Sequence, residues 1–110
     1  MDKAHLKKSF ADQAKGKSIA NQMYNSKADI LFACAGYSGL GVLECAKETW
    51  KYAIGVDRDQ NNVAPDNILK SAMKKVNKGV YTVVKDLKDG KLDGGKTLVK
   101  VVGLYEYKYF

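Results

Sequence analysis

The stretch that decides the fold is ILFACAGYSGLGVLECAKETWKYAIGVDRDQ, residues 30–60. It begins with a short apolar run, residues 30–35, of the kind that forms a strand buried on both faces. A glycine-rich turn follows, and the spacing of the next apolar residues predicts a helix that ends near Trp50. A second apolar run, residues 52–56, leads into a polar loop. The order strand, turn, helix, strand predicts a βαβ unit with parallel strands.

Upstream of this unit the sequence predicts one more helix. Residues 10–25 carry apolar side chains at helical spacing, as in the pair Ile19 and Met23. Asp12 stands where it can cap this helix or lie in its first turn, near the positive end of the helix dipole. Residues 1–8 are too rich in lysine to be buried on both faces, so we expect a poorly ordered leader there.

Downstream of the unit the periodicity changes three times. Residues 68–74 are ambiguous, and we expect a strand or an extended segment. Residues 76–87 place valines and a leucine on one face, which predicts an amphipathic helix that stops at Asp89 and Gly90. Residues 97–103 predict another strand, and tyrosines that alternate with charged residues over 104–110 predict an extended tail.

Together these elements predict one α/β domain over residues 1–110. The expected architecture is a three-layer α-β-α sandwich with helices on both faces of a mainly parallel sheet. An apolar content of 45% with 28% charged residues excludes a disordered tail. No apolar run reaches the roughly 18–20 residues that cross a bilayer. The first residues lack the apolar core of a signal peptide, so the sequence as written predicts a cytoplasmic location.

The net charge of +7 raises the question of nucleic-acid binding. All but one of the 19 basic residues are lysines, and the exception is Arg58. Arginine is the residue that reads bases and phosphates in planar, bidentate geometry. Because the lysines are also spread along the chain, we expect a solvated basic surface and no specific nucleic-acid partner.

Enzyme motifs are incomplete in this sequence. The segment around Tyr37 lacks the second glycine and the histidine of a nucleophile elbow, and the S-x-x-K spacing of residues 71–74 has no companion motif. His5 is the single histidine, and Cys34 and Cys45 are not in a CxxC arrangement. The two cysteines are interpreted as buried free thiols, although a disulfide between them stays open. We therefore expect no enzymatic activity, no metal and no cofactor.

Two loops are placed where a ligand could bind. In open parallel sheets, ligands bind outside the carboxyl ends of the strands. The loop of residues 35–39 opens a helix, so its backbone N–H groups can receive hydroxyls, carbonyls or anions. The loop of residues 56–60 carries Asp57, and a carboxylate fixed there can accept two hydrogen bonds from a vicinal diol such as that of ribose.

An ordered set of motifs resembles one known family. It includes AGYSGLGV at 35–42, AIGVDRDQ at 53–60 and APDNILKSAMKKV at 64–76. Over residues 9–104 the string resembles the basic membrane protein family, the purine nucleoside receptor-type solute-binding lipoproteins of bacterial ABC importers. The resemblance implies one lobe of a type I periplasmic-binding-protein fold, here the carboxyl-terminal lobe, and a permease of the importer as partner.

The resemblance also implies roles for five residues. Asp57 corresponds to the carboxylate on the ribose hydroxyls, Gly36 to a backbone contact and Lys74 to a polar ribose contact. For the ring that stacks on the base, the expected residue is Phe32, with Tyr37 second. Other interpretations stay open, because Phe32 can be a core ring, Asp57 a loop or capping carboxylate, and Lys74 a solvated lysine.

The sequence also departs from the family, whose members are much longer and carry a signal and a lipidated cysteine. With one lobe, one wall of the cleft is present, so we expect the chain alone to bind nucleosides weakly or not at all. The uncovered apolar surface predicts a homodimer, formed through the tail or an exchanged element. An alternative function is a single-lobe interaction or regulatory module that has lost transport.

Overall fold

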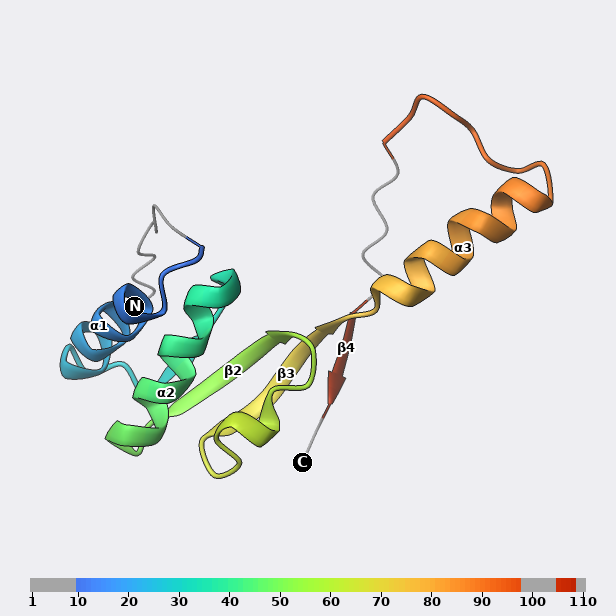
Figure 1. Ribbon diagram of the computed structural model, residues 1–110. Helices are drawn as coiled ribbons and strands as arrows, with labels where there is room; N and C mark the ends of the chain where they lie inside the picture. The colour runs from blue at the N-terminus through green and yellow to red at the C-terminus, as the bar shows by residue number, and fades with distance from the viewer. Residues whose placement is uncertain (1–9, 98–104, 109–110) are drawn as a thin grey trace.

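The computed structural model describes residues 10–97 and 105–108. Its elements are α1 (Gln13–Asn25), β1 (Ile30–Phe32), the short helix η1 (Gly36–Ser38), α2 (Gly39–Thr49), β2 (Tyr52–Asp57), the short helix η2 (Asn61–Val63), β3 (Ile68–Lys74), α3 (Val76–Lys88) and β4 (Tyr105–Lys108). The strands form one sheet in the order β1-β2-β3-β4 (Figure 1). The first three strands are parallel, and β4 is antiparallel to β3. The predicted α/β class, the βαβ unit and the mainly parallel sheet are confirmed.

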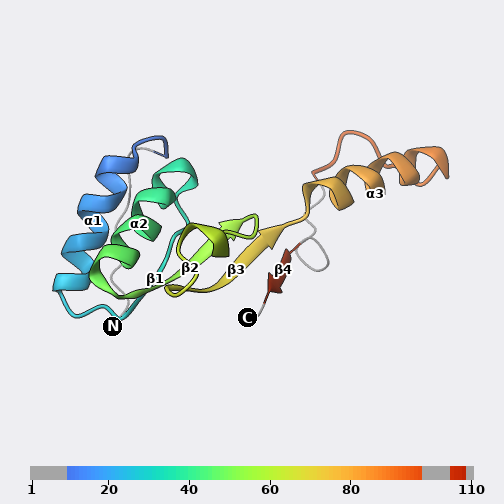
Figure 2. The same ribbon diagram turned by 60° about the horizontal axis from the view of Figure 1, so that its bottom comes forward.

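Helices α1 and α2 lie side by side on one face of the sheet (Figures 1 and 2). Asp12 caps α1, because its carboxylate accepts a hydrogen bond of 2.9 Å from the Lys15 N–H. Gly41 sets how closely the two helices pack, since a Cβ at this position would lie 2.0 Å from the Gln13 carbonyl oxygen. The ammonium of Lys17 then pairs across the helices with Glu48 at 2.7 Å.

The core lies between these two helices and the sheet, and small side chains dominate it. Its buried members are Ala20, Tyr24, Leu31, Ala33, Leu43, Cys45, Ala46, Ala53, Ala64 and Ile68. The Tyr24 hydroxyl donates a 2.8 Å hydrogen bond to the Tyr52 carbonyl. The buried amide of Asn67 donates to the Lys51 carbonyl at 2.9 Å and to the Ala46 carbonyl at 3.3 Å. The Tyr24 bond holds α1 against β2, and the Asn67 bonds hold the start of β3 against the end of α2.

The opposite face of the sheet is open at β1 and β2. Ile30, Phe32 and Tyr52 are 48%, 57% and 46% exposed, and the described residues place no helix over them. The prediction of a strand over residues 30–35, buried on both faces, is therefore wrong in extent and in burial, since β1 ends at Phe32. An apolar run shows that both faces of a strand are suited to burial, but it does not show what supplies the cover.

Helix α3 confirms the amphipathic pattern but does not cover the sheet. It begins one residue after β3 ends and extends away from the rest of the described chain (Figures 1 and 2). None of its residues is buried. It ends as predicted at Asp89, followed by Gly90 with φ of +69°. The expected second helical layer is thus not formed by the described residues.

Some sequence predictions fall outside the described residues. The leader expected at residues 1–8 is one of them, and the strand expected over 97–103 lies there from residue 98 onward. The segment 104–110, for which an extended tail is expected, contributes β4 at Tyr105–Lys108. The strand or extended segment expected at 68–74 is β3.

Candidate ligand-binding edge

The three parallel strands bring three of the predicted site residues to one edge of the sheet. Asp57 is the last residue of β2 and Lys74 the last of β3, and in the register of these strands Asp57 lies opposite Met73. Gly36 begins η1, which follows β1. Because β1, β2 and β3 run in the same direction, their carboxyl ends share this edge.

Asp57 stands in a three-residue γ-turn. Its φ is +67°, and the Arg58 N–H donates to the Val56 carbonyl at 2.8 Å. Positive φ costs free energy for a residue with a Cβ, and such strain persists only where the surroundings impose it. The turn stops the strand and leaves the carboxylate exposed to solvent.

A buried polar cluster holds this turn in place. The side-chain oxygen of Gln60 accepts a 2.7 Å hydrogen bond from the Val56 N–H, and the Gln60 N–H donates to the Ser71 hydroxyl at 3.1 Å. Gly55 makes room for both groups, since a Cβ there would lie 2.8 Å from each of the two side-chain oxygens. The backbone on each side of Asp57 is therefore anchored to β3.

Gly36 has φ of +55° and lies against the chain that precedes α1. A Cβ at Gly36 would lie 3.2 Å from the Phe10 carbonyl oxygen, which accepts a 3.1 Å hydrogen bond from the Ser38 N–H. The Ser38 hydroxyl in turn accepts a 2.8 Å bond from the Asp12 N–H. The residue before α1 is thus attached to the glycine-rich turn.

Three exposed aromatic residues, Phe10, Phe32 and Tyr37, are candidates for a ring that stacks on a ligand. Phe10 and Tyr37 are 65% and 60% exposed; Phe10 contacts the turn at Gly36 through its carbonyl bond to Ser38, and Tyr37 directly follows Gly36. Phe32 lies on the open face of β1, opposite the buried Leu31, so the interpretation of Phe32 as a buried core ring is wrong. Sequence analysis missed Phe10 as a candidate. Its signal was an apolar ring two residues before Asp12, the N-cap of α1.

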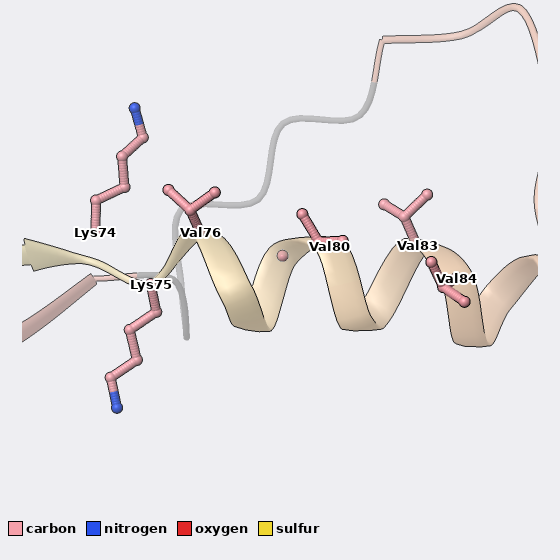
Figure 3. Close-up of a pocket in the computed structure, with 7 residues that line it drawn as sticks. Lys74, Lys75, Val76, Val80, Val83 and Val84 are labelled. Carbon is pink, nitrogen blue, oxygen red and sulfur yellow. The ribbon is translucent and has the colours of Figure 1, made fainter.

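Lys74 lies at the junction of the edge and a separate groove. The groove has a volume of about 410 Å³ and is lined by Lys74, Lys75, Val76, Gly79, Val80, Val83 and Val84. Figure 3 shows the Lys74 side chain on the same side as Val76, Val80 and Val83, and Lys75 on the opposite side. The walls of this groove are almost entirely apolar, so the groove does not suit a polar diol. The edge at Asp57 offers an exposed carboxylate that can accept hydrogen bonds.

The two cysteines are free, so no disulfide joins them, and the interpretation as buried thiols is confirmed for Cys45 and wrong for Cys34. Cys34 is exposed just beyond β1, and Cys45 is buried in α2. Burial, and to a smaller extent the charge of Glu48, raises the pKa of the Cys45 thiol. Among residues 10–97 and 105–108 no three histidine, cysteine or acidic side chains are grouped as metal ligands would be. The same residues include no helix that is long and apolar enough to span a membrane.

The sequence matches the family model described as ABC transporter substrate-binding protein PnrA-like over residues 4–104. Basic membrane protein D of Borreliella burgdorferi (strain JD1) is 50% identical over 92 residues, which cover 81% of this chain and 27% of that protein. Basic membrane protein A of Borreliella burgdorferi (strain ATCC 35210 / DSM 4680 / CIP 102532 / B31) is 41% identical over 93 residues, which cover 82% of this chain and 27% of that protein. The chain spans about a quarter of the length of these relatives.

Solved structures share the fold. An ABC transporter solute-binding protein from Aeropyrum pernix K1 superposes with a TM-score of 0.76 at 29% identity, and the match covers 91% of this chain and 29% of that one. A transcriptional activator of the comK gene from Bacillus halodurans superposes with a TM-score of 0.85 at 21% identity, and the match covers 96% of this chain and 38% of that one. At this identity the match shows a shared fold alone. One lobe of a periplasmic-binding-protein fold is thereby confirmed. Since the family model covers nearly the whole chain and the fold agrees with it, the chain belongs to the basic membrane protein family of PnrA-like ABC transporter substrate-binding proteins.

Proposed function

We propose that this chain supplies one wall of a nucleoside-binding site in a solute-binding protein of an ABC importer. The observation that carries the proposal is the edge itself, where the ends of three parallel strands bring Gly36, Asp57 and Lys74 together. The family match supports a small-molecule ligand and a permease as partner. It does not favour the alternative of a regulatory module without transport.

Each residue of the edge has a distinct chemical task in this proposal. The exposed carboxylate of Asp57 accepts hydrogen bonds from the two ribose hydroxyls, and its γ-turn fixes the direction of approach. The ammonium of Lys74 donates to a ribose oxygen. The backbone at Gly36 approaches the ligand closely because it has no Cβ. These contacts bind and orient a ligand and break no bond, so we expect binding without catalysis.

The stacking ring is assigned differently from the sequence prediction. We propose Phe10 as the ring on the base, since it is exposed and its carbonyl is hydrogen-bonded to the turn that contains Gly36. Tyr37 stays second. Phe32 lies on the open sheet face and is the weakest of the three, because its side chain belongs to the face of the strand and not to the loop.

One wall gives weak binding. All five proposed contact residues are exposed: Phe10, Gly36, Tyr37, Asp57 and Lys74. The described residues would therefore cover a bound nucleoside on one side and leave its other side in solvent. Good small-molecule sites bury about 70–90% of the ligand surface. A second lobe is therefore needed for tight binding. The family acts at the cell envelope, which conflicts with the cytoplasmic location expected from the sequence.

The test is a titration of the isotope-labelled chain with adenosine, guanosine and inosine, followed by NMR. We expect dissociation constants of about 1 mM or weaker, with shifts confined to the amides around Gly36, Asp57 and Lys74. Asp57→Asn removes the charge and keeps the shape, and it abolishes the shifts. Asp66→Asn, at an exposed aspartate in the loop before β3, is the matched control and leaves them unchanged. Shifts centred elsewhere would refute the site, and micromolar binding to a monomer would refute the single wall.

A further inference from the structure

The conformation of Asp57 is not explained by the strand to which it belongs. Among residues 10–97 and 105–108, the residues other than glycine with a positive φ are Lys27, Trp50 and Asp57. Lys27 and Trp50 follow α1 and α2, and a left-handed residue is an ordinary way to end a helix. Asp57 instead ends a strand, where extended backbone is the rule. Contacts from outside β2 must therefore hold Asp57 in its turn.

The side chain of Gln60 reaches back to this turn. Gln60 is 7% exposed, and its side-chain oxygen accepts the 2.7 Å hydrogen bond from the Val56 N–H. The Val56 carbonyl accepts the bond from Arg58 that closes the turn, so both polar backbone groups before Asp57 are bonded to loop residues. β1 does not take this place, because its pairing with β2 ends at Ile54. Gln60 thus supplies a hydrogen bond that a neighbouring strand would otherwise give.

Gln60 also connects the turn to β3, the strand that ends at Lys74. Its backbone N–H donates to the buried hydroxyl of Ser71 at 3.1 Å. Ser71 lies opposite Gly55 in the register of β2 and β3, three residues before Lys74. A single residue therefore ties the Asp57 turn to the two strands whose ends carry the charged groups of the edge.

We propose that Gln60 is the positioning residue for Asp57 and makes the edge select ribonucleosides over 2′-deoxyribonucleosides, an inference that rests on the proposed function. Two hydrogen bonds to a vicinal diol require both carboxylate oxygens in one fixed direction, whereas a single hydroxyl can be followed by a carboxylate that turns. Fixing the turn before the ligand arrives lowers the entropy cost of the two-point contact. Gln60 acts through the backbone of Asp57 and does not need to touch the ligand.

The first test uses the isotope-labelled chain without a ligand. Gln60→Met keeps the length of the side chain and removes the oxygen that bonds to Val56. We expect the NMR coupling constants of Asp57 to change from those of positive φ to those of extended backbone, and the Val56 N–H to exchange at least about 10-fold faster. Asn67→Leu is the matched control, because Asn67 is a buried amide at the other end of β3 and its bonds do not involve the turn. This control should lower stability and leave the couplings of Asp57 unchanged.

The conformation of Asp57 decides the first test. An Asp57 that keeps its positive φ in Gln60→Met overturns the proposal. If Gln60→Met does not fold, Ser71→Ala takes its place, because it removes the hydroxyl that accepts the Gln60 N–H. We expect the couplings of Asp57 to change in the same direction, and unchanged couplings would overturn the proposal equally.

The second test measures selectivity in the folded variants. Each chain is titrated with inosine and with 2′-deoxyinosine, and the initial slopes of the amide shifts around Asp57 are compared. In the unmodified chain we expect a slope about 10-fold lower for 2′-deoxyinosine, since a hydrogen bond to a charged group is lost. Gln60→Met should bring the two slopes within about 2-fold of each other, because only inosine has a second hydrogen bond to lose. Asn67→Leu should keep the ratio of the unmodified chain.

The results of this titration separate the role of Gln60 from the proposed function. If Gln60→Met lowers both slopes equally and keeps their ratio, Gln60 has a structural role alone and the inference is refuted, while the nucleoside site stands. Equal slopes in the unmodified chain would also refute the selectivity. If neither ligand shifts the edge amides of the unmodified chain, the proposed function itself is refuted, and the selectivity with it.

Discussion

The close packing of α1 on α2 allows the effect of Gly41→Ala on stability to be predicted. In an exposed helix interior, alanine would be about 1 kcal/mol more favourable than glycine. Here the added Cβ would lie 2.0 Å from the Gln13 carbonyl oxygen and 2.7 Å from the Lys17 nitrogen. Both are backbone atoms of α1, so no side chain can rotate away. The helix as a whole must move by more than an ångström, and overpacking of this kind costs about 1–3 kcal/mol or more.

We therefore expect Gly41→Ala to lower the free energy of unfolding by about 2 kcal/mol. That is a large part of the total for a small domain, which is typically about 5–15 kcal/mol. The assay is urea denaturation followed by circular dichroism at 222 nm. Gly94→Ala is the control, because a Cβ there meets nothing within 4 Å and its φ is not positive. If Gly41→Ala is as stable as the unmodified chain, or more stable, then the close approach of α1 and α2 is wrong.

Two further predictions concern the strained turn and the buried thiol. Asp57→Gly should raise the free energy of unfolding by about 1 kcal/mol, because glycine adopts φ of +67° without strain, while it abolishes nucleoside-induced NMR shifts. If Asp57→Gly destabilises the lobe, the γ-turn is not strained. The pKa of the Cys45 thiol is raised above its ordinary 9.0, chiefly by burial. Above pH 9, therefore, the thiol stays neutral in the folded chain over a range in which it ionises in the unfolded chain. Stability is then fully present below pH 9 and falls as the pH rises from there towards the raised pKa. We measure the free energy of unfolding at pH 7 and pH 10 by denaturation. Its decrease between the two pH values should be smaller for Cys45→Ala than for the unmodified chain, and equal decreases would contradict the burial of the thiol.

Most of the fold could be predicted from local pattern. The continuous apolar runs and the glycine-rich turn between them specify the βαβ unit, because period and turn chemistry are local properties. The position of α3 could not be predicted in this way. The spacing of its valines encodes a face suited to burial, and the sequence alone does not say whether that face meets the same chain. The same reasoning explains β1, whose run of apolar residues is longer than the strand and whose second face is open.

The candidate edge was predicted in part for a similar reason. Asp57 ends β2 and the loop with Gly36 follows β1, so parallel topology alone predicts that both lie at one edge. Lys74, which ends β3, was predicted from the family resemblance and not from topology. Phe10 could not be placed, because its position depends on a hydrogen bond between residues 28 apart in the chain, from the Ser38 N–H to the Phe10 carbonyl. No local pattern encodes such a contact. The buried support of Gln60 and Ser71 beneath the Asp57 turn was missed on the same ground, since it joins the loop after β2 to β3.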